Sequence, residues 1–225
     1  MNELHEVKEL QKYLAVRKKI YSLLGYAFYK EADAEYIAEL RTFMPIFKEL
    51  QGALGNEHLL QGIDYVEATS DAELGILKMQ FARIFLSTSY ATKLKSVVPQ
   101  ESVYLSPNRI SMQDQRDEVL EIYYSEGIGK NKDFHEPDDH ITAEFHFMSQ
   151  MSQKSIDDLD SGITAALPRL KLQVDFLNNH ILKWVPAVCD DIVEITETNF
   201  FKAVAKLTNG FIETDCQMLT GLIEQ

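Results

Sequence analysis

The chain has 225 residues, of which 45% are hydrophobic and 25% are charged. This is the composition of a globular protein with a buried core, and it excludes intrinsic disorder. Gly and Pro number only 10 and 6, too few for a β-sandwich or barrel, which turns about every 8–12 residues. The net charge of −13 disfavours binding to nucleic acid or anionic lipid and favours a cationic partner, although an acidic surface also serves solubility alone.

The cysteines and the chain's hydrophobic pattern bear on its compartment. Cys189 and Cys216 are the only cysteines, with no Cys-x-x-Cys and no histidine pair beside them, which argues against a disulfide scaffold or a thiolate zinc site. The N-terminal residues lack the apolar core of a secretory signal, and no run approaches the ~18 apolar residues of a membrane span. We therefore expect a soluble protein of a reducing compartment.

Apolar residues recur at helical spacing through the first third of the chain. The pattern predicts a long helix over residues 13–28, a helix capped by Asp33 and bent by Pro45, and a short helix over 57–68. Asp71 is then expected to cap a strongly apolar helix that reaches Phe85.

Residues 87–111 have no helical period and predict a long loop, and loops of that length are usually functional or disordered. Helix resumes over 112–125, and a second loop over 126–136 leads to Pro137, which suits the first position of a helix reaching residue 153. Two more helices are expected from Pro168 to Trp184 and from Phe200 to Leu207, the latter stopped by Asn209 and Gly210, before an amphipathic segment over 211–223.

No repeat, low-complexity stretch or strand pattern interrupts this series. The fold class is therefore predicted as all-α, a single bundle-like domain over residues 1–225 with about nine to eleven helices. The loop over 126–136 is its one candidate hinge.

The segment from Glu136 to His140 gathers three acids and a histidine where a helix is expected to begin, and Glu144 follows. Glu136 as a cap, with acids in the first turn, would complement the helix dipole without any further role. A metal site is the alternative, because His140 and Glu144 are four residues apart. However, bundle carboxylate sites use two Glu-x-x-His motifs, and this chain has no second copy.

Residues 127–132, Gly-Ile-Gly-Lys-Asn-Lys, superficially resemble a phosphate-binding loop. They lack the Gly-x4-Gly-Lys-Ser/Thr spacing and no strand precedes them, so a turn is the simpler interpretation. No nucleophile–base pattern such as Gly-x-Ser-x-Gly occurs. The sequence therefore gives no indication of an enzyme.

Phe81, Ile84 and Phe85 share one helical face just before the long loop. This spacing is typical of a core stripe, but an apolar groove has the same pattern. Periodicity leaves both interpretations open.

Three stretches together resemble the TorD/DmsD/NarJ family of molybdoenzyme chaperones, also called redox enzyme maturation proteins. The first is Phe81-x-x-Ile84-Phe85 followed by residues 98–104, Val-Pro-Gln-Glu-Ser-Val-Tyr. The second is residues 136–141, Glu-Pro-Asp-Asp-His-Ile, with an acid and Phe-Met downstream, and the third runs from Phe176 through Trp184 to Leu207-Thr208. The order and spacing of these stretches are similar to those of the family over roughly residues 75–212. Phe81 and Ile84 stand where the family often has Trp and Leu, and Gln100 where some members have an aromatic, so the subgroup and its client are left open.

The resemblance implies a cytoplasmic chaperone rather than an enzyme, with no cofactor of its own. Such a chaperone binds the twin-arginine signal peptide, or the apo form, of a molybdopterin oxidoreductase catalytic subunit, and so aids cofactor insertion and prevents premature export. The residues that the resemblance assigns to peptide binding are Phe81, Ile84, Phe85, Pro99, Gln100, Glu101, Ser102, Tyr104, Glu136, Asp139 and His140. A monomer is expected, although domain-swapped dimers occur in the family and the 126–136 loop could serve as their hinge.

Elementary energetics agree with such a role. A twin-arginine leader has a basic region followed by an apolar stretch, which calls for an apolar groove floored by Phe81, Ile84 and Phe85 and for carboxylates nearby. Two or three buried apolar side chains at about 1.5–3 kcal/mol each, with carboxylate–arginine bonds, bring micromolar affinity within reach. Two alternatives stay open: a guanine-nucleotide-responsive protein and an all-α adaptor with a different protein partner.

Overall fold

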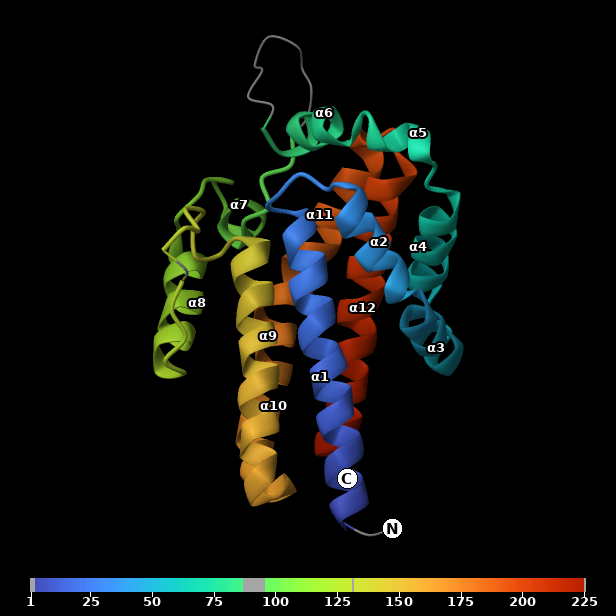
Figure 1. Cartoon of the computed structure of the whole chain (residues 1–225). Helices are drawn as coiled ribbons and strands as arrows, with labels where there is room; N and C mark the ends of the chain where they lie inside the picture. The colour runs from blue at the N-terminus through green and yellow to red at the C-terminus, as the bar shows by residue number, and fades with distance from the viewer. Residues whose placement is uncertain (1–2, 87–95, 131, 225) are drawn as a thin grey trace. The chain divides into compact units, whose positions relative to one another are not determined.

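The computed structural model describes residues 3–86, 96–130 and 132–224, and in these ranges the chain is helical with no strand. The all-α prediction is therefore confirmed. The helices, labelled in Figure 1, are α1 (Glu3–Ala27), α2 (Ala34–Thr42), α3 (Met44–Leu54), α4 (Glu57–Ala68), α5 (Asp71–Leu74), α6 (Leu77–Phe81), α7 (Glu101–Leu105), α8 (Asp114–Ser125), α9 (Ile141–Asp158), α10 (Ile163–Phe176), α11 (Leu182–Ile195) and α12 (Asn199–Ile223). Residues 82–86 and 177–181 are π-helical, and Leu159–Ser161 is a 3-10 turn. None of the described helices has the length and hydropathy needed to cross a bilayer.

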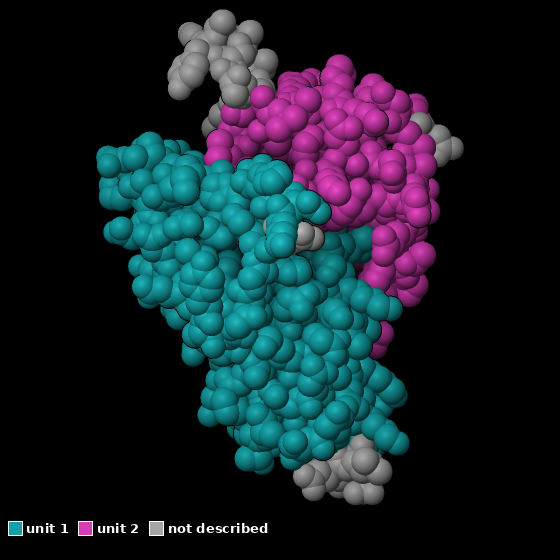
Figure 2. All heavy atoms as spheres, turned by 60° about the vertical axis from the view of Figure 1, so that its left-hand side comes forward, with its two compact units in different colours: residues 1–25, 100–183, 215–225 teal, residues 26–99, 184–214 magenta. Residues whose placement is uncertain are grey.

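The chain forms two compact units, coloured separately in Figure 2. Unit 1 contains residues 1–25, 100–183 and 215–225, and unit 2 contains residues 26–99 and 184–214. The predicted hinge, residues 126–136, lies inside unit 1, whereas the chain passes from one unit to the other at residues 25–26, 99–100, 183–184 and 214–215. The candidate site residues are divided as well, since Phe81, Ile84, Phe85 and Pro99 belong to unit 2 and the others to unit 1.

A fully buried arginine ties the long helices of unit 1 together. Arg17 on α1 donates to Asp215 through Nε at 2.6 Å and to Ser152 on α9 at 2.7 Å, and it also bonds Gln173 on α10. Asp215 in turn accepts hydrogen bonds from the hydroxyls of Tyr13 and Tyr21. Because a buried charge is costly unless it is paired and hydrogen-bonded, this network fixes how α1, α9, α10 and the end of α12 pack.

In unit 2, α4 and α12 approach each other closely at two glycines. A Cβ on Gly62 of α4 would lie 2.8 Å from Leu207, and one on Gly210 of α12 would lie 2.6 Å from the main-chain nitrogen of Leu59. The prediction that Asn209 and Gly210 stop the helix is therefore wrong, because α12 continues through Gly210 to Ile223. Its missing side chain makes room for α4.

Other helix boundaries also differ from the predicted ones. Asp33 does cap α2, accepting from the Tyr36 N–H at 2.9 Å, but Pro45 stands in the first turn of a separate helix, α3, instead of bending one long helix. The apolar segment predicted over 71–85 is divided into α5, α6 and a π-helical turn, and its N-cap position is Ser70.

The long loop predicted over 87–111 contains a helix that the sequence did not indicate. Residues 87–95 lie outside the described residues, but Glu101–Leu105 form α7. The helix predicted to begin at Pro137 begins four residues later, at Ile141. Both differences have one cause, which is the pairing of these two segments described next.

Candidate functional site

In unit 1, the segments around residues 100–104 and 136–140 lie side by side. Gln100 and His140 form an isolated antiparallel bridge. The Glu101 N–H donates to the Asp139 carbonyl oxygen at 2.9 Å, and the Ser102 N–H donates to Asp139 Oδ2, also at 2.9 Å. The N-cap residue of α7, Gln100, makes no side-chain capping bond. Asp139 therefore supplies, from 37 residues away, the acceptor that the first turn of a helix needs.

The Glu101 carboxylate is buried against a histidine of the second π-helical turn. Nδ1 of His180 lies 3.1 Å from both carboxylate oxygens, and His180 also packs on Phe176 with ring centroids 4.9 Å apart. Burial raises the pKa of Glu101, and the charge of Asp139 adds to this rise, while the His180 contact opposes it. His180 was not among the predicted site residues, because no spacing rule connects positions 79 residues apart.

Asp138 binds α8 and the turn after it to the same segment. Its carboxylate accepts from Arg116 through Nε at 3.0 Å, and Lys130 lies 3.4 Å away. Its carbonyl oxygen accepts from the Tyr123 hydroxyl at 3.2 Å, and burial raises the pKa of that tyrosine. Asp138 is thus an ion-pair partner that precedes α9, which begins at Ile141. The prediction that it lies in the first turn of the helix and complements the helix dipole is wrong.

His140, rather than Glu136, is the cap of α9. Its Nδ1 accepts from the Thr142 N–H at 3.1 Å, so the ring is neutral with its proton on Nε2. Burial, with a smaller effect from the charge of Lys130, lowers the pKa of His140 to about 3. Glu136 is half-buried, and its carbonyl oxygen accepts from Lys130 at 2.6 Å.

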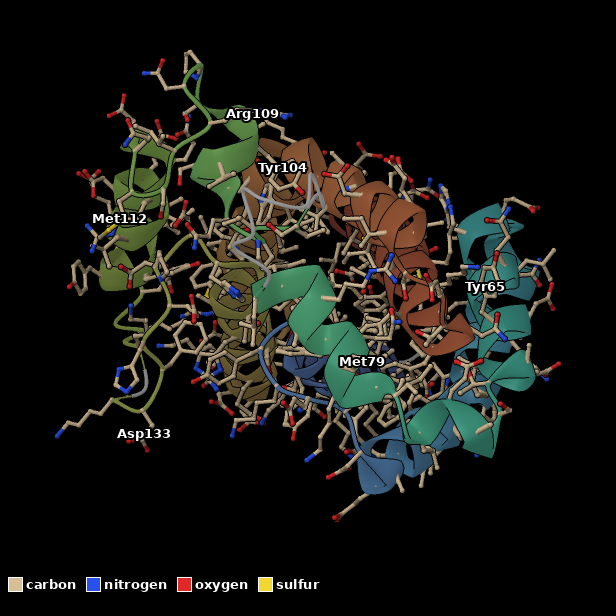
Figure 3. The ribbon with its side chains drawn as sticks, turned by 90° about the horizontal axis from the view of Figure 1, so that it is seen from above. Tyr65, Met79, Tyr104, Arg109, Met112 and Asp133 are labelled. Carbon is tan, nitrogen blue, oxygen red and sulfur yellow. The ribbon has the colours of Figure 1, made fainter. Side chains whose placement is uncertain are left out.

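Two buried polar atoms beside this bridge have no hydrogen-bond partner among the described residues. They are Oδ1 of Asp139 and Oγ of Ser102, and both residues are 0% exposed. An unsatisfied buried polar group costs about 1–3 kcal/mol, so the region around the bridge is a candidate for function. Tyr104, on the same short helix, is half-buried and is labelled in Figure 3.

The apolar candidates belong to an aromatic cluster in unit 2. Phe81, Ile84 and Pro99 are buried and only Phe85 is partly exposed. The ring of Phe85 lies 5.0 Å from that of Phe81 and 6.2 Å from that of Phe28. Core packing therefore accounts for Phe81 and Ile84 as they stand, and Phe85 is the member of the trio that offers surface.

The exposed apolar surface of this region comes from neighbouring residues that the sequence did not single out. Met79 and Leu86 are 61% and 63% exposed, and Ile76 is exposed too; Figure 3 shows Met79 on α6. With Phe85 they form what we call the α6 apolar face: Ile76, Met79, Phe85 and Leu86. Their hydrophobicity is the same as that of the core residues, so the sequence pattern alone does not distinguish the exposed side chains from the buried ones.

Gly127 and Ile128, the first residues of the turn predicted over 127–132, end α8. Gly127 has φ of 63°, its N–H donates to the Tyr124 carbonyl oxygen at 3.0 Å, and the Ile128 N–H donates to that of Tyr123 at 2.9 Å. These are the two bonds of a Schellman C-cap, so the glycine serves the helix end. In the part of the chain that the structure describes, no three His, Cys, Asp or Glu side chains are placed to hold a metal ion.

Comparison with known proteins gives the same family as the motifs. Residues 29–190 match the family described as Nitrate reductase delta subunit. The chain belongs to this family, the TorD/DmsD/NarJ family. Its members include similar proteins named Chaperone protein TorD: that of Vibrio cholerae is 26% identical over 93% of this chain and 94% of its own length. That of Photobacterium profundum is 29% identical over 89% of this chain and 90% of its own length. That of Aliivibrio salmonicida is 28% identical over 98% of this chain and 100% of its own length.

Proposed function

We propose that this protein is a cytoplasmic chaperone for the catalytic subunit of a molybdopterin oxidoreductase. It binds the subunit's twin-arginine leader, its apo form, or both, so that cofactor is inserted before export. The observation that carries the proposal is the match to relatives named Chaperone protein TorD along nearly the whole length of both chains. In this role the protein acts by binding and needs no catalytic residue.

The α6 apolar face is the surface we assign to the apolar stretch of the leader. Phe85, Met79 and Leu86 offer large side chains whose burial would contribute about 1.5–3 kcal/mol each. After ordering costs, such a surface supports affinity near the micromolar range, about −8 kcal/mol. That affinity suits a reversible escort.

Asp139 and His140 have a positioning role in this proposal. Both are buried, and their bonds fix the start of α7 and the start of α9. Gln100, Glu101 and Ser102 belong to the same framework. Tyr104 and Glu136, which are half-buried, are the members of the unit 1 set with surface to offer a peptide.

Calorimetry with a synthetic twin-arginine leader peptide tests the proposal. We expect the wild-type chain to bind it with a dissociation constant of about 1–10 µM, and Phe85→Ala and Leu86→Ser each to weaken binding about tenfold. Leu54→Ser is the matched control, because Leu54 is a similarly exposed leucine of unit 2 on α3. Absence of binding by the wild-type chain at about 100 µM peptide would overturn the leader-binding function.

The client is identified by a second experiment. Co-purification from the native organism, with mass spectrometry of the bound proteins, should return a molybdopterin oxidoreductase subunit whose gene carries an Arg-Arg leader. Recovery of an unrelated partner instead would favour the adaptor interpretation. Sedimentation of the purified chain should give a monomer.

A further inference from the structure

The short helix α7 of unit 1 is packed in an unusual way, because the side chains that it buries are polar. Glu101 and Ser102 are 1% and 0% exposed, and Ser106, which follows the helix, is 7% exposed. Residues 103–105, Val-Tyr-Leu, are only half-buried. Among the five described residues of α7, no apolar side chain is therefore fully buried, and a helix of this length is not stable by itself.

The segment that follows α7 is mostly at the surface. Residues 107–110 are exposed, and Met112 is 61% exposed. Arg109 and Met112, both labelled in Figure 3, have φ of 52° and 60°, in the left-handed region that residues other than glycine, asparagine and aspartate seldom adopt. We call residues 101–112, which comprise α7 and this turn, the α7 segment.

Polar contacts hold the α7 segment in place. Asp139 accepts the two main-chain bonds at the start of α7. The carboxylate of Glu101 contacts His180, and the Ser111 hydroxyl bonds Oε1 of Gln100. When such groups are uncovered, water replaces their partners, so each contact contributes little net free energy to closure.

Three polar atoms that are buried here have no hydrogen-bond partner among the described residues. They are Oγ of Ser102, Oγ of Ser106 and Oδ1 of Asp139. An unpartnered polar atom gains hydrogen bonds to water once it is uncovered, so all three favour opening of the α7 segment. The carboxylate of Glu101 acts in the same direction, because burial raises its pKa and thus disfavours its ionised form.

The helix α9 of the same unit is built in the opposite way. Phe145, Phe147 and Met148 are all 0% exposed, so α9 is held by apolar burial, the main favourable contribution to folding. Parts of a protein with few buried apolar contacts open at a lower free energy than its core. The α7 segment therefore has the features of a locally unfolding element, and α9 has those of the core.

We propose that the α7 segment is a lid, which opens by local unfolding while α9 stays folded, and that its opening uncovers the carboxylates of Glu101 and Asp139. In the closed state these two residues are 1% and 0% exposed, so neither carboxylate is accessible to a ligand. Opening of the lid therefore controls access to two residues that the family resemblance assigns to binding. The inference concerns unit 1 alone and does not depend on the proposed function.

Amide hydrogen exchange of the native protein, followed by NMR, tests the opening. The N–H groups of Glu101, Ser102 and Ser106 are hydrogen-bonded in the closed state. We expect their protection factors to be at least about 100-fold lower than those of Phe145 and Phe147 on α9, with little dependence on urea below the unfolding transition. Equal protection and equal urea dependence would overturn the inference, because the α7 segment would then open only with global unfolding.

Carboxylate labelling tests whether opening uncovers the two acids. The probe is a carbodiimide with glycine ethyl ester, and mass spectrometry identifies the modified residues. Asp215 is the matched control, because it is a buried aspartate of unit 1 that Arg17 holds outside the α7 segment. We expect Glu101 and Asp139 to be modified in the native protein and Asp215 to stay unmodified. Modification of all three residues only when the chain unfolds would overturn the inference.

A pair of serine variants tests the physical cause. Ser102→Ala removes an unpartnered buried hydroxyl and should slow exchange of the Glu101 and Ser106 N–H groups about tenfold. Ser125→Ala is the matched control, because Ser125 is an exposed serine of α8, and it should change these rates less than twofold. Exchange in Ser102→Ala that is as fast as in the wild-type protein, or faster, would contradict a lid destabilised by its buried polar groups.

Discussion

The main-chain N–H of Ser102 donates to the carboxylate of Asp139 across 37 residues of sequence, at 2.9 Å. A neighbouring bond runs from the Glu101 N–H to the Asp139 carbonyl oxygen. Together the two bonds join the segments around residues 100–104 and 136–140 into one structural element. The helix α7 has five residues, too few to be stable on its own propensity. Its existence therefore depends on this distant acceptor.

Removing the acceptor should destabilise the protein. We expect Asp139→Ala to lower the free energy of unfolding by about 1–3 kcal/mol, because the buried Ser102 N–H loses its partner. Asp139→Asn, which keeps an oxygen in reach of that N–H, should lose less than half as much. Urea denaturation followed by far-UV circular dichroism measures both, and equal losses would show that the carboxylate's charge, rather than its acceptor role, is what matters.

The buried pair of Glu101 and His180 should behave as one unit. We predict that Glu101→Gln and His180→Gln each destabilise the fold, and that the double variant loses less than the sum by about 1–3 kcal/mol, the usual range for residues in direct contact. A double-mutant cycle in urea gives this coupling. Additive losses would mean that the 3.1 Å contacts contribute no net stability.

Much of the fold could be predicted from the sequence because the helices are amphipathic and their caps are local. The spacing of apolar residues predicts α1 and α4, and the sequence predicts Asp33 as the cap of α2 because its side chain accepts from an N–H only three residues away. The boundaries that were wrong depend on partners far away in the sequence. Residues 101–105 are helical through Asp139, and Pro137 does not start α9 because residues 138–140 are engaged in the bridge and its ion pairs.

The candidate site could be predicted only in part, for a related reason. The sequence shows the motifs over residues 98–104 and 136–141 as patterns, but a pattern does not indicate which of their side chains are buried. The resemblance assigns Glu101 and Asp139 to peptide binding, whereas in the structure His180 and the main chain of α7 already engage their carboxylates. The exposed Met79, Leu86 and Met112 are as hydrophobic as core residues, so hydrophobicity alone does not distinguish them. Leu86 lies in the π-helical turn and Met112 has a left-handed backbone, neither of which the sequence pattern predicts.

The neutral His140 predicts a dependence of stability on pH. Its pKa is about 3 in the folded protein and about 6.5 when exposed, so below pH 6.5 the unfolded state binds a proton that the native state excludes. The contribution of the neutral His140 to the free energy of unfolding is therefore complete above pH 6.5 and is lost as the pH falls toward 3. Between pH 7 and pH 5 the loss is about 2 kcal/mol.

His140→Asn isolates this contribution, because asparagine is a good N-cap that does not titrate. Between pH 7 and pH 5, we expect the free energy of unfolding of the variant to fall by about 2 kcal/mol less than that of the wild-type protein. Urea titrations at several pH values would measure this difference. Other groups, Glu101 among them, titrate equally in both proteins and cancel in the difference. Parallel pH profiles for the two proteins would contradict a neutral, buried His140.

The close approach of α4 and α12 predicts opposite effects for two glycines of one helix. A Cβ at Gly210 would lie 2.6 Å from the Leu59 nitrogen and 2.9 Å from Oδ1 of Asn56, whereas one at Gly221 would meet nothing within 4 Å. Gly210→Ala should therefore lower the free energy of unfolding by about 1–3 kcal/mol through overpacking, and Gly221→Ala should raise it by up to about 1 kcal/mol through helix propensity. Thermal and urea denaturation measure both, and a Gly210→Ala protein as stable as the wild type would mean that α4 is not held against α12.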